Sequence, residues 1–116
     1  DGEFGNDFSE SINGKWFAGF PNLASLNLSG NHICQIDSSC FSHLKTLEFL
    51  DLSFNKLKSL GAKDLKGLDN LTGLNLSFCQ IKHVDSNAFN STPSLSEIYL
   101  QSNKISNLSS KTFTRT

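Results

Sequence analysis

The sequence predicts an α/β-type solenoid of stacked repeats, in which each repeat adds one short strand to a parallel β-sheet. The first observation is a spacing of 24 residues that links Leu26, Leu50, Leu74 and Ile98. The second is that other apolar columns keep this spacing: Leu28, Leu52, Leu76 and Leu100; Leu23, Leu47, Leu71 and Leu95. The third is a column that contains Asn31, Asn55, Cys79 and Asn103. A fixed period of this size indicates a repeat architecture with one shared core.

The repeating unit reads L-x-x-L-x-L-x-x-N/C-x-I/L, which is the leucine-rich repeat pattern. Strand alternation directs Leu26 and Leu28 inward and Asn27 to the concave face, where the sheet is expected. The convex side is expected to be irregular or to contain short helices. Its interior is filled by another column with the same spacing: Phe17, Phe41, Leu65, Phe89 and Phe113.

The pattern divides the chain into about four to five repeats. They comprise a partial repeat at 6–22, followed by 23–46, 47–70, 71–94 and 95–116. Residues 1–5 are interpreted as vector-derived, because Asp1–Phe4 has no place on the pattern and a common cloning site encodes Glu-Phe. Neither end carries a proper cap, and terminal repeats need a polar outer face. We therefore expect a fragment of a longer solenoid.

Two positions interrupt the regular columns. Thr92 stands where Phe20, Leu44 and Leu68 of the preceding repeats predict an apolar residue, and Pro93 follows it at once. This pair predicts an irregular convex loop in that repeat. Cys79 replaces an asparagine of the inward-facing column, and we expect it to be buried and unpaired.

Composition argues against several functional classes. The net charge of −1 does not favour binding to nucleic acid, and no apolar run approaches the length of a membrane span. Lys56, Lys58, Lys63 and Lys66 crowd one repeat, but acidic residues lie among them, which favours a solvated convex surface. The sequence has no phosphate-binding loop, zinc motif or nucleophile elbow. We therefore expect no enzyme activity, cofactor or metal.

Five glycosylation sequons favour a secreted or cell-surface parent protein. They begin at Asn27, Asn70, Asn75, Asn90 and Asn107. The alternative for Asn27 and Asn75 is that N-L-S arises from the repeat consensus itself. A glycan at either of these two positions would obstruct the concave face.

The three cysteines leave at least one thiol unpaired. Cys34 and Cys40 belong to one repeat, and they either form a disulfide or remain as two free thiols. Both possibilities are open from the sequence. Cys79 lies two strands away from Cys34, roughly 10 Å at the usual strand spacing, which is too far for a bridge.

The concave columns are the default binding surface. Candidate binding residues there are Phe49, Asp51, Glu97 and Tyr99, because large aromatic side chains are enriched at binding hot spots. The alternative is that single exposed aromatic residues are ordinary. Phe54 and Phe78 form another aromatic pair, which we expect to shield the turn after the strand rather than to contact a ligand.

Residues 47–55 and 74–81, which read LEFLDLSFN and LNLSFCQI, resemble the repeats of Toll-like receptor ectodomains. The resemblance implies a non-catalytic, ligand-binding and dimerising segment of an innate immune receptor. It also implies a protein or microbial ligand and a membrane-anchored parent, with this segment on the extracellular or endosomal-lumenal side. The sequence gives no direct sign of nucleic-acid binding. Two alternatives are an adhesion or guidance protein that binds protein partners, and a structural core protein of the extracellular matrix.

Overall fold

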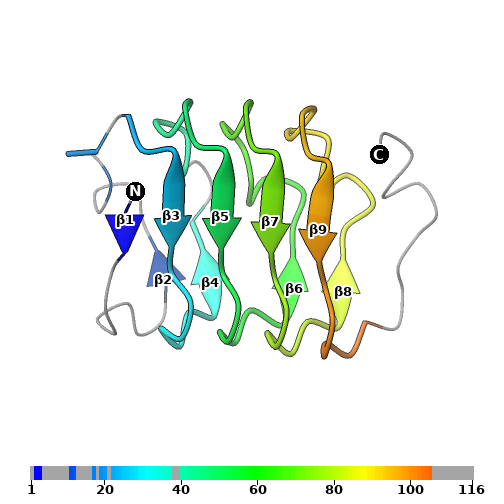
Figure 1. Ribbon diagram of the computed structural model, residues 1–116. Helices are drawn as coiled ribbons and strands as arrows, with labels where there is room; N and C mark the ends of the chain where they lie inside the picture. Colours follow the sequence, from blue (N-terminus) through cyan, green and yellow to red (C-terminus); the bar gives the residue numbers. More distant parts are fainter. Residues whose placement is uncertain are drawn as a thin grey trace.

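The main feature of the fold is a parallel sheet of five strands in the order β1-β3-β5-β7-β9. The computed structural model describes residues 2–3, 11–12, 17, 19–20, 22–37 and 40–105. The strands lie side by side along the array in Figure 1: β1 (Gly2–Glu3), β3 (Ser25–Asn27), β5 (Phe49–Asp51), β7 (Gly73–Asn75) and β9 (Glu97–Tyr99). This arrangement confirms the predicted repeat solenoid.

The register of the sheet follows the sequence period. Leu50 pairs with Leu26 on one side and with Leu74 on the other, and Leu74 pairs in turn with Ile98. Gly2 pairs with Leu26 by the same step of 24 residues. Residues 2–3 therefore lie on the repeat register, although the sequence pattern had placed them outside it; their interpretation as vector-derived residues stays a prediction.

Short strands on the other side of the coil form two separate parallel pairs. One pair joins β2 (Ser11–Ile12) to β4 (Gln35–Ile36), and the other joins β6 (Ser59–Leu60) to β8 (His83–Val84). In Figure 1 these strands lie behind the main sheet and run in the opposite direction. No α-helix occurs in the described residues, so this side of the coil consists there of short strands and turns.

The core lies between these two layers and is made of the repeated apolar columns. Leu26, Leu50 and Leu74 are completely buried. The rings of Phe17 and Phe41 stack with their centroids 6.0 Å apart in the aromatic column. Each repeat thus buries its apolar side chains against its neighbours, which is how a solenoid obtains its stability.

The predicted irregularity at Thr92 and Pro93 is wrong. The Thr92 backbone N–H donates to the Phe89 carbonyl at 3.2 Å, just as the Leu44 N–H donates to the Phe41 carbonyl at 3.0 Å. Thr92 is buried, and its hydroxyl also donates to the Phe89 carbonyl. The Thr92 hydroxyl therefore has a hydrogen-bond partner within its own turn. Pro93, which has no backbone N–H, is tolerated because the hydrogen bonds of this turn need no donor at that residue.

The asparagine column connects successive repeats through hydrogen bonds. The Asn55 side-chain oxygen accepts from the backbone N–H groups of Asn31 (3.0 Å) and Ile33 (2.9 Å). Its amide nitrogen donates to the Leu28 and Leu52 carbonyls. Buried backbone groups at the turn after each strand are satisfied in this way.

Cys79 occupies the asparagine-column position of the repeat that follows Asn55, with a thiol in place of the amide. Its Sγ donates to the Leu52 carbonyl at 2.9 Å. Burial raises the pKa of the Cys79 thiol, and the neighbouring backbone amides of Asn55 and Phe54 oppose that rise only in part. Cys79 is free and buried, which confirms the sequence prediction.

Candidate ligand-binding surface

The exposed face of the main sheet carries three columns of side chains. We call this surface the sheet face. It comprises the columns Ser25, Phe49, Gly73, Glu97; Asn27, Asp51, Asn75, Tyr99; and Ser29, Ser53, Ser77, Gln101. Most of these residues are small and polar, so the few large or charged side chains are the candidates for ligand contact.

Asp51 takes part in a hydrogen-bond motif within its own repeat. Its Oδ1 accepts from the Ser53 backbone N–H at 3.0 Å and from the Ser53 hydroxyl at 2.6 Å. Asn27 accepts from Ser29 in the same two ways. We call this pair of bonds the Asx–Ser motif. It occupies Oδ1 of the half-buried Asp51, so this candidate residue supports the strand end more than it offers a free carboxylate.

Phe49 lies across the neighbouring strand. A Cβ atom built at Gly73 would be 2.7 Å from Cδ1 of Phe49, so the ring occupies the space above that glycine. Gly73 is buried beneath it, while Phe49 itself is 36% exposed. The absence of a side chain at residue 73 therefore determines how the Phe49 ring is presented.

Glu97 and Tyr99 both belong to β9 and are exposed. Tyr99 is 41% exposed, and it stands in the column where the preceding repeats have Asn75 and Asp51. Glu97 is in register with Gly73, the residue that the Phe49 ring covers. Three of the four predicted residues are thus exposed side chains on the same sheet, with Phe49 on β5 and the other two on β9, one strand (β7) apart from it.

The predicted glycosylation residues differ in their surroundings. Asn75 is half-buried on the sheet face, where its Oδ1 accepts from the Ser77 backbone. Asn70 is exposed and donates to the Lys45 carbonyl at 2.6 Å, and the exposed Asn90 donates to Asn87. Asn107 lies outside the described residues. Of these positions, a glycan at Asn27 or Asn75 would cover the sheet face.

The sequence left open whether Cys34 and Cys40 form a disulfide or remain free thiols. In the structure both are free thiols. Cys34 is exposed and Cys40 is buried. The two cysteines lie on either side of the extended strand β4 (Gln35–Ile36), which separates them. Burial raises the pKa of the Cys40 thiol far above its ordinary value, and the nearby carboxylates of Asp37 and Asp64 raise it further.

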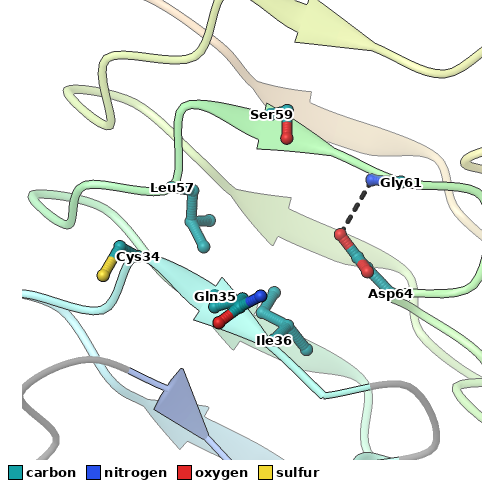
Figure 2. Close-up of a pocket in the computed structure, with 7 residues that line it drawn as sticks. All are labelled: Cys34, Gln35, Ile36, Leu57, Ser59, Gly61 and Asp64. Carbon is teal, nitrogen blue, oxygen red and sulfur yellow. Dashed lines mark hydrogen bonds between the residues drawn. The ribbon is translucent and has the colours of Figure 1, made fainter.

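A small pocket lies on the side opposite the sheet face. It has a volume of about 240 Å³ and lies between β4 and β6, which belong to different strand pairs. Figure 2 shows its lining residues, among which Asp64 accepts a 2.8 Å hydrogen bond from the Gly61 backbone N–H. The pocket contains none of the predicted binding residues. No cluster that could hold a metal ion is found within the described ranges.

The fold and its columns agree with a known family. The family model described as the leucine rich repeat matches residues 21–81 and 69–115. The chain belongs to the leucine-rich repeat family. It is therefore a repeat domain of the protein-interaction type. Within the part of the chain that the structure describes, no helix has the length and apolar character that a membrane crossing requires.

Sequence relatives match a limited part of the chain. Tsukushi of Gallus gallus is 52% identical over 42 residues, which cover 36% of this chain and 11% of that protein. Tsukushi of Xenopus tropicalis is likewise 52% identical over 42 residues, which cover 12% of its length. The matched segment thus spans about a tenth of the length of these relatives.

Solved structures match more of the chain. The Drosophila Toll–Spatzle complex gives a TM-score of 0.72 at 31% identity, and the match covers 78% of this chain and 12% of the other. The TLR13–ssRNA13 complex gives 0.76 at 29% identity, with 90% and 18% covered. The APL1 leucine-rich repeat domain gives 0.84 at 24% identity, with 91% and 28% covered, and supports the fold alone. The predicted resemblance to Toll-like receptor ectodomains is confirmed.

Proposed function

We propose that this chain is a ligand-binding segment of an innate immune receptor of the Toll-like class, and that the sheet face is its binding surface. The observation that carries the proposal is the grouping of exposed Phe49, Glu97 and Tyr99 on a sheet that otherwise presents small polar side chains. The similarity to Toll and to TLR13 supports the receptor class.

The chemistry of this surface favours a protein or microbial ligand with both an apolar and a cationic part. Phe49 and Tyr99 supply rigid aromatic area, which contributes much of the binding energy in many interfaces. The exposed Glu97 supplies a carboxylate, whereas Oδ1 of the half-buried Asp51 already accepts two hydrogen bonds from Ser53. The proposed role is ligand binding without catalysis.

The parent protein is proposed to carry this segment on the extracellular or endosomal-lumenal side of a membrane and to pair two copies when a ligand binds. The five sequons support a secretory route, and exposed Asn70 and Asn90 are accessible to a glycan. Expression in secreting eukaryotic cells, followed by mass spectrometry of tryptic peptides, tests this assignment. Unmodified asparagine at every sequon would contradict it.

The binding surface is tested by surface plasmon resonance with Spatzle, a bacterial lipopeptide and a single-stranded RNA as separate probes. We expect at least one probe to bind, and Phe49→Ser and Tyr99→Asn each to weaken it by roughly tenfold, the usual order for a hot-spot residue. Lys66→Gln is the matched control, because Lys66 is exposed on another side. Binding by none of the probes, or equal binding by all variants, would overturn the proposal.

A second candidate is a leucine-rich repeat protein outside the receptor class that binds protein partners without pairing, as an adhesion, guidance or matrix protein would. The 52% identity to Tsukushi over 42 residues favours this candidate. Analytical ultracentrifugation of the chain with its bound probe separates the two. Assembly of two copies around the ligand supports the receptor, and a strict one-to-one complex supports the alternative.

A further inference from the structure

Two phenylalanine rings form an exposed stack at the edge where the chain leaves the main sheet. The rings of Phe54 and Phe78 lie 4.6 Å apart and are inclined by only 5°. Their backbone N–H groups donate to the Ser77 and Gln101 carbonyls of the following repeat, both at 3.0 Å. Both residues have a φ of 58°, so the turn directs the rings away from the core. The stack is therefore held rigidly and lies outside the sheet face.

The outer face of this stack is open. The residue before Phe54 in the same column is Gly30, and a Cβ built there would meet nothing within 4 Å. The residue after Phe78 in the column is Ser102, which is small and exposed. The ring spacing of 4.6 Å is close to the usual strand spacing of about 4.8 Å, so the stack runs along the array. A further planar group thus has room beside Phe54, which is 60% exposed.

Exposed lysines follow this column within a few residues along the chain. Lys56 and Lys104 lie two residues after this column, and Lys58 and Lys82 lie four residues after it. All four are exposed, and the described part of the chain gives none of them an ion pair; the pair that it does contain joins Lys45 to Asp69. Hydrogen bonds from the Lys56 and Lys104 backbone N–H groups to the Ile33 and Ile81 carbonyls hold these two backbone positions against the preceding repeat.

Acidic residues are absent from this part of each repeat. Residues 30–35, 54–59, 78–83 and 102–105 contain no aspartate or glutamate. The edge therefore combines a stacking surface with a positive charge that nothing in these segments neutralises. We call the surface formed by Phe54, Phe78, Lys56, Lys58 and Lys82 the aromatic–lysine edge.

We propose that the aromatic–lysine edge binds an acidic segment of a protein partner, and that an aromatic side chain of this segment stacks on Phe54 beside Gly30. This proposal departs from the sequence-based expectation that Phe54 and Phe78 only shield the turn, because their side chains are 60% and 45% exposed. Parallel stacking of aromatic rings adds to the free energy of burial, and flanking carboxylates pair with the lysines. This interaction is separate from the sheet face and does not depend on which ligand that face binds.

The charge distribution favours a short acidic peptide over a long polyanion. The whole chain has a net charge of −1, whereas nucleic-acid-binding domains are usually strongly basic. Asp51 lies on the sheet side of the edge, and Asp37 and Asp85 lie on the convex side. A polyanion that ran beyond the edge would meet these carboxylates. An extended peptide of roughly four residues spans the same length as three strand spacings.

The probe for this proposal is a fluorescently labelled pentapeptide with a central tryptophan and two acidic residues on each side. Anisotropy titrations measure its Kd against the intact chain at low and moderate salt. We expect saturable binding that weakens with salt, and loss of binding when alanine replaces the tryptophan. A peptide that does not bind at all would overturn the proposal.

The variants separate stacking from charge. Phe54→Asn removes the ring but tolerates the positive φ, and it should weaken binding by roughly tenfold. Phe54→Tyr retains the ring and should bind as the parent chain does. Lys56→Gln with Lys58→Gln should weaken binding several-fold and flatten the salt dependence. Lys66→Gln, an exposed lysine outside the edge, should leave binding unchanged.

Further outcomes would contradict the assignment directly. Equal peptide binding by Phe54→Asn and the parent chain would show that the stack is not the site. An oligo-dT strand or heparin that binds more tightly and displaces the peptide would show that the partner is a polyanion instead. Tyr99→Asn should leave peptide binding intact, so failure of this proposal and failure of the sheet-face proposal give different results.

Discussion

The repeats on β3, β5 and β7 differ from the repeat on β9 in how they use their exposed strand residues. In the first three, an asparagine or aspartate accepts two hydrogen bonds from the serine two residues later, as Asn27 does from Ser29. In the last, Tyr99 and Gln101 occupy these two positions. Leu26, Leu50 and Leu74 are fully buried, whereas Ile98 is only partly buried.

This difference means that one column carries two kinds of side chain. Where the column carries asparagine or aspartate, its side-chain oxygen stabilises the end of the strand. Where it carries Tyr99, a large side chain is 41% exposed. A substitution in the first three repeats should therefore act on stability, and a substitution in the β9 repeat should act on binding.

The largest effect is expected in the core of the first three repeats. Leu74→Ala should lower the free energy of unfolding by about 2–5 kcal/mol, because it leaves a cavity between two neighbouring strands. Ile98→Ala should cost less, since Ile98 is only partly buried. Urea denaturation followed by circular dichroism measures both. Equal losses for the two variants would remove the contrast between these repeats.

The Asx–Ser motif should give the next largest effect. Asp51→Ala removes the acceptor of the Ser53 N–H and hydroxyl, and Ser53 is buried, so we expect a loss of about 1–3 kcal/mol. Asp51→Asn retains the acceptor and should be nearly neutral. Tyr99→Ala, the matched change on β9, should cost clearly less than Asp51→Ala. A stability loss at Tyr99 as large as that at Asp51 would show that both residues are structural.

The sequence predicted the strand columns and their register well, because one period recurs in every repeat. It did not predict that Asp51 is engaged by Ser53, because the column pattern records which side of the strand a residue faces but not its hydrogen bonds. Nor did it predict that Thr92 takes a buried position with its hydroxyl satisfied. The orientation of Phe49 depends on the glycine one strand away, and such a contact between repeats is visible only in the folded chain.

A smaller effect, this time a gain in stability, is expected when asparagine replaces the cysteine in the asparagine column. Cys79→Asn should supply an oxygen for the Asn55 and Leu57 backbone N–H groups, just as Asn55 does for Asn31 and Ile33. The net value of such hydrogen bonds predicts a gain of about 1 kcal/mol. Cys79→Ala, which removes the thiol and adds no acceptor, is the control and should destabilise the chain.

Thiol labelling before and after denaturation checks that Cys79 is buried in the native chain, which this prediction assumes. Cys34 is exposed and should react in the native chain, whereas Cys79 should react only after unfolding. If Cys79→Asn proved as destabilising as Cys79→Ala, the column at this position would accept a small side chain only, and the hydrogen-bond argument would not extend to this repeat.

The smallest effect on stability should come from Gly73→Ala, which nevertheless changes the sheet face. The added Cβ would lie 2.7 Å from Cδ1 of Phe49, so the ring must move away from the glycine. The ring is partly exposed and free to turn toward solvent, and the substitution also reduces the entropy of the unfolded chain. These effects oppose each other, and we expect a net change within about 1 kcal/mol.

A double-mutant cycle isolates the contact between these two residues. In a Phe49→Ala background, Gly73→Ala no longer meets a ring and should be neutral or stabilising, so the two changes should not be additive. Gly67→Ala is the contrasting control: its Cβ would lie 2.4 Å from the Cα of Ser42, and its φ of 98° is strained for alanine, so it should be strongly destabilising. Additive effects of Gly73→Ala and Phe49→Ala would mean that the ring does not rest on the glycine. The sheet face would then present Phe49 independently of β7, and the comparison between repeats would lose its link to binding.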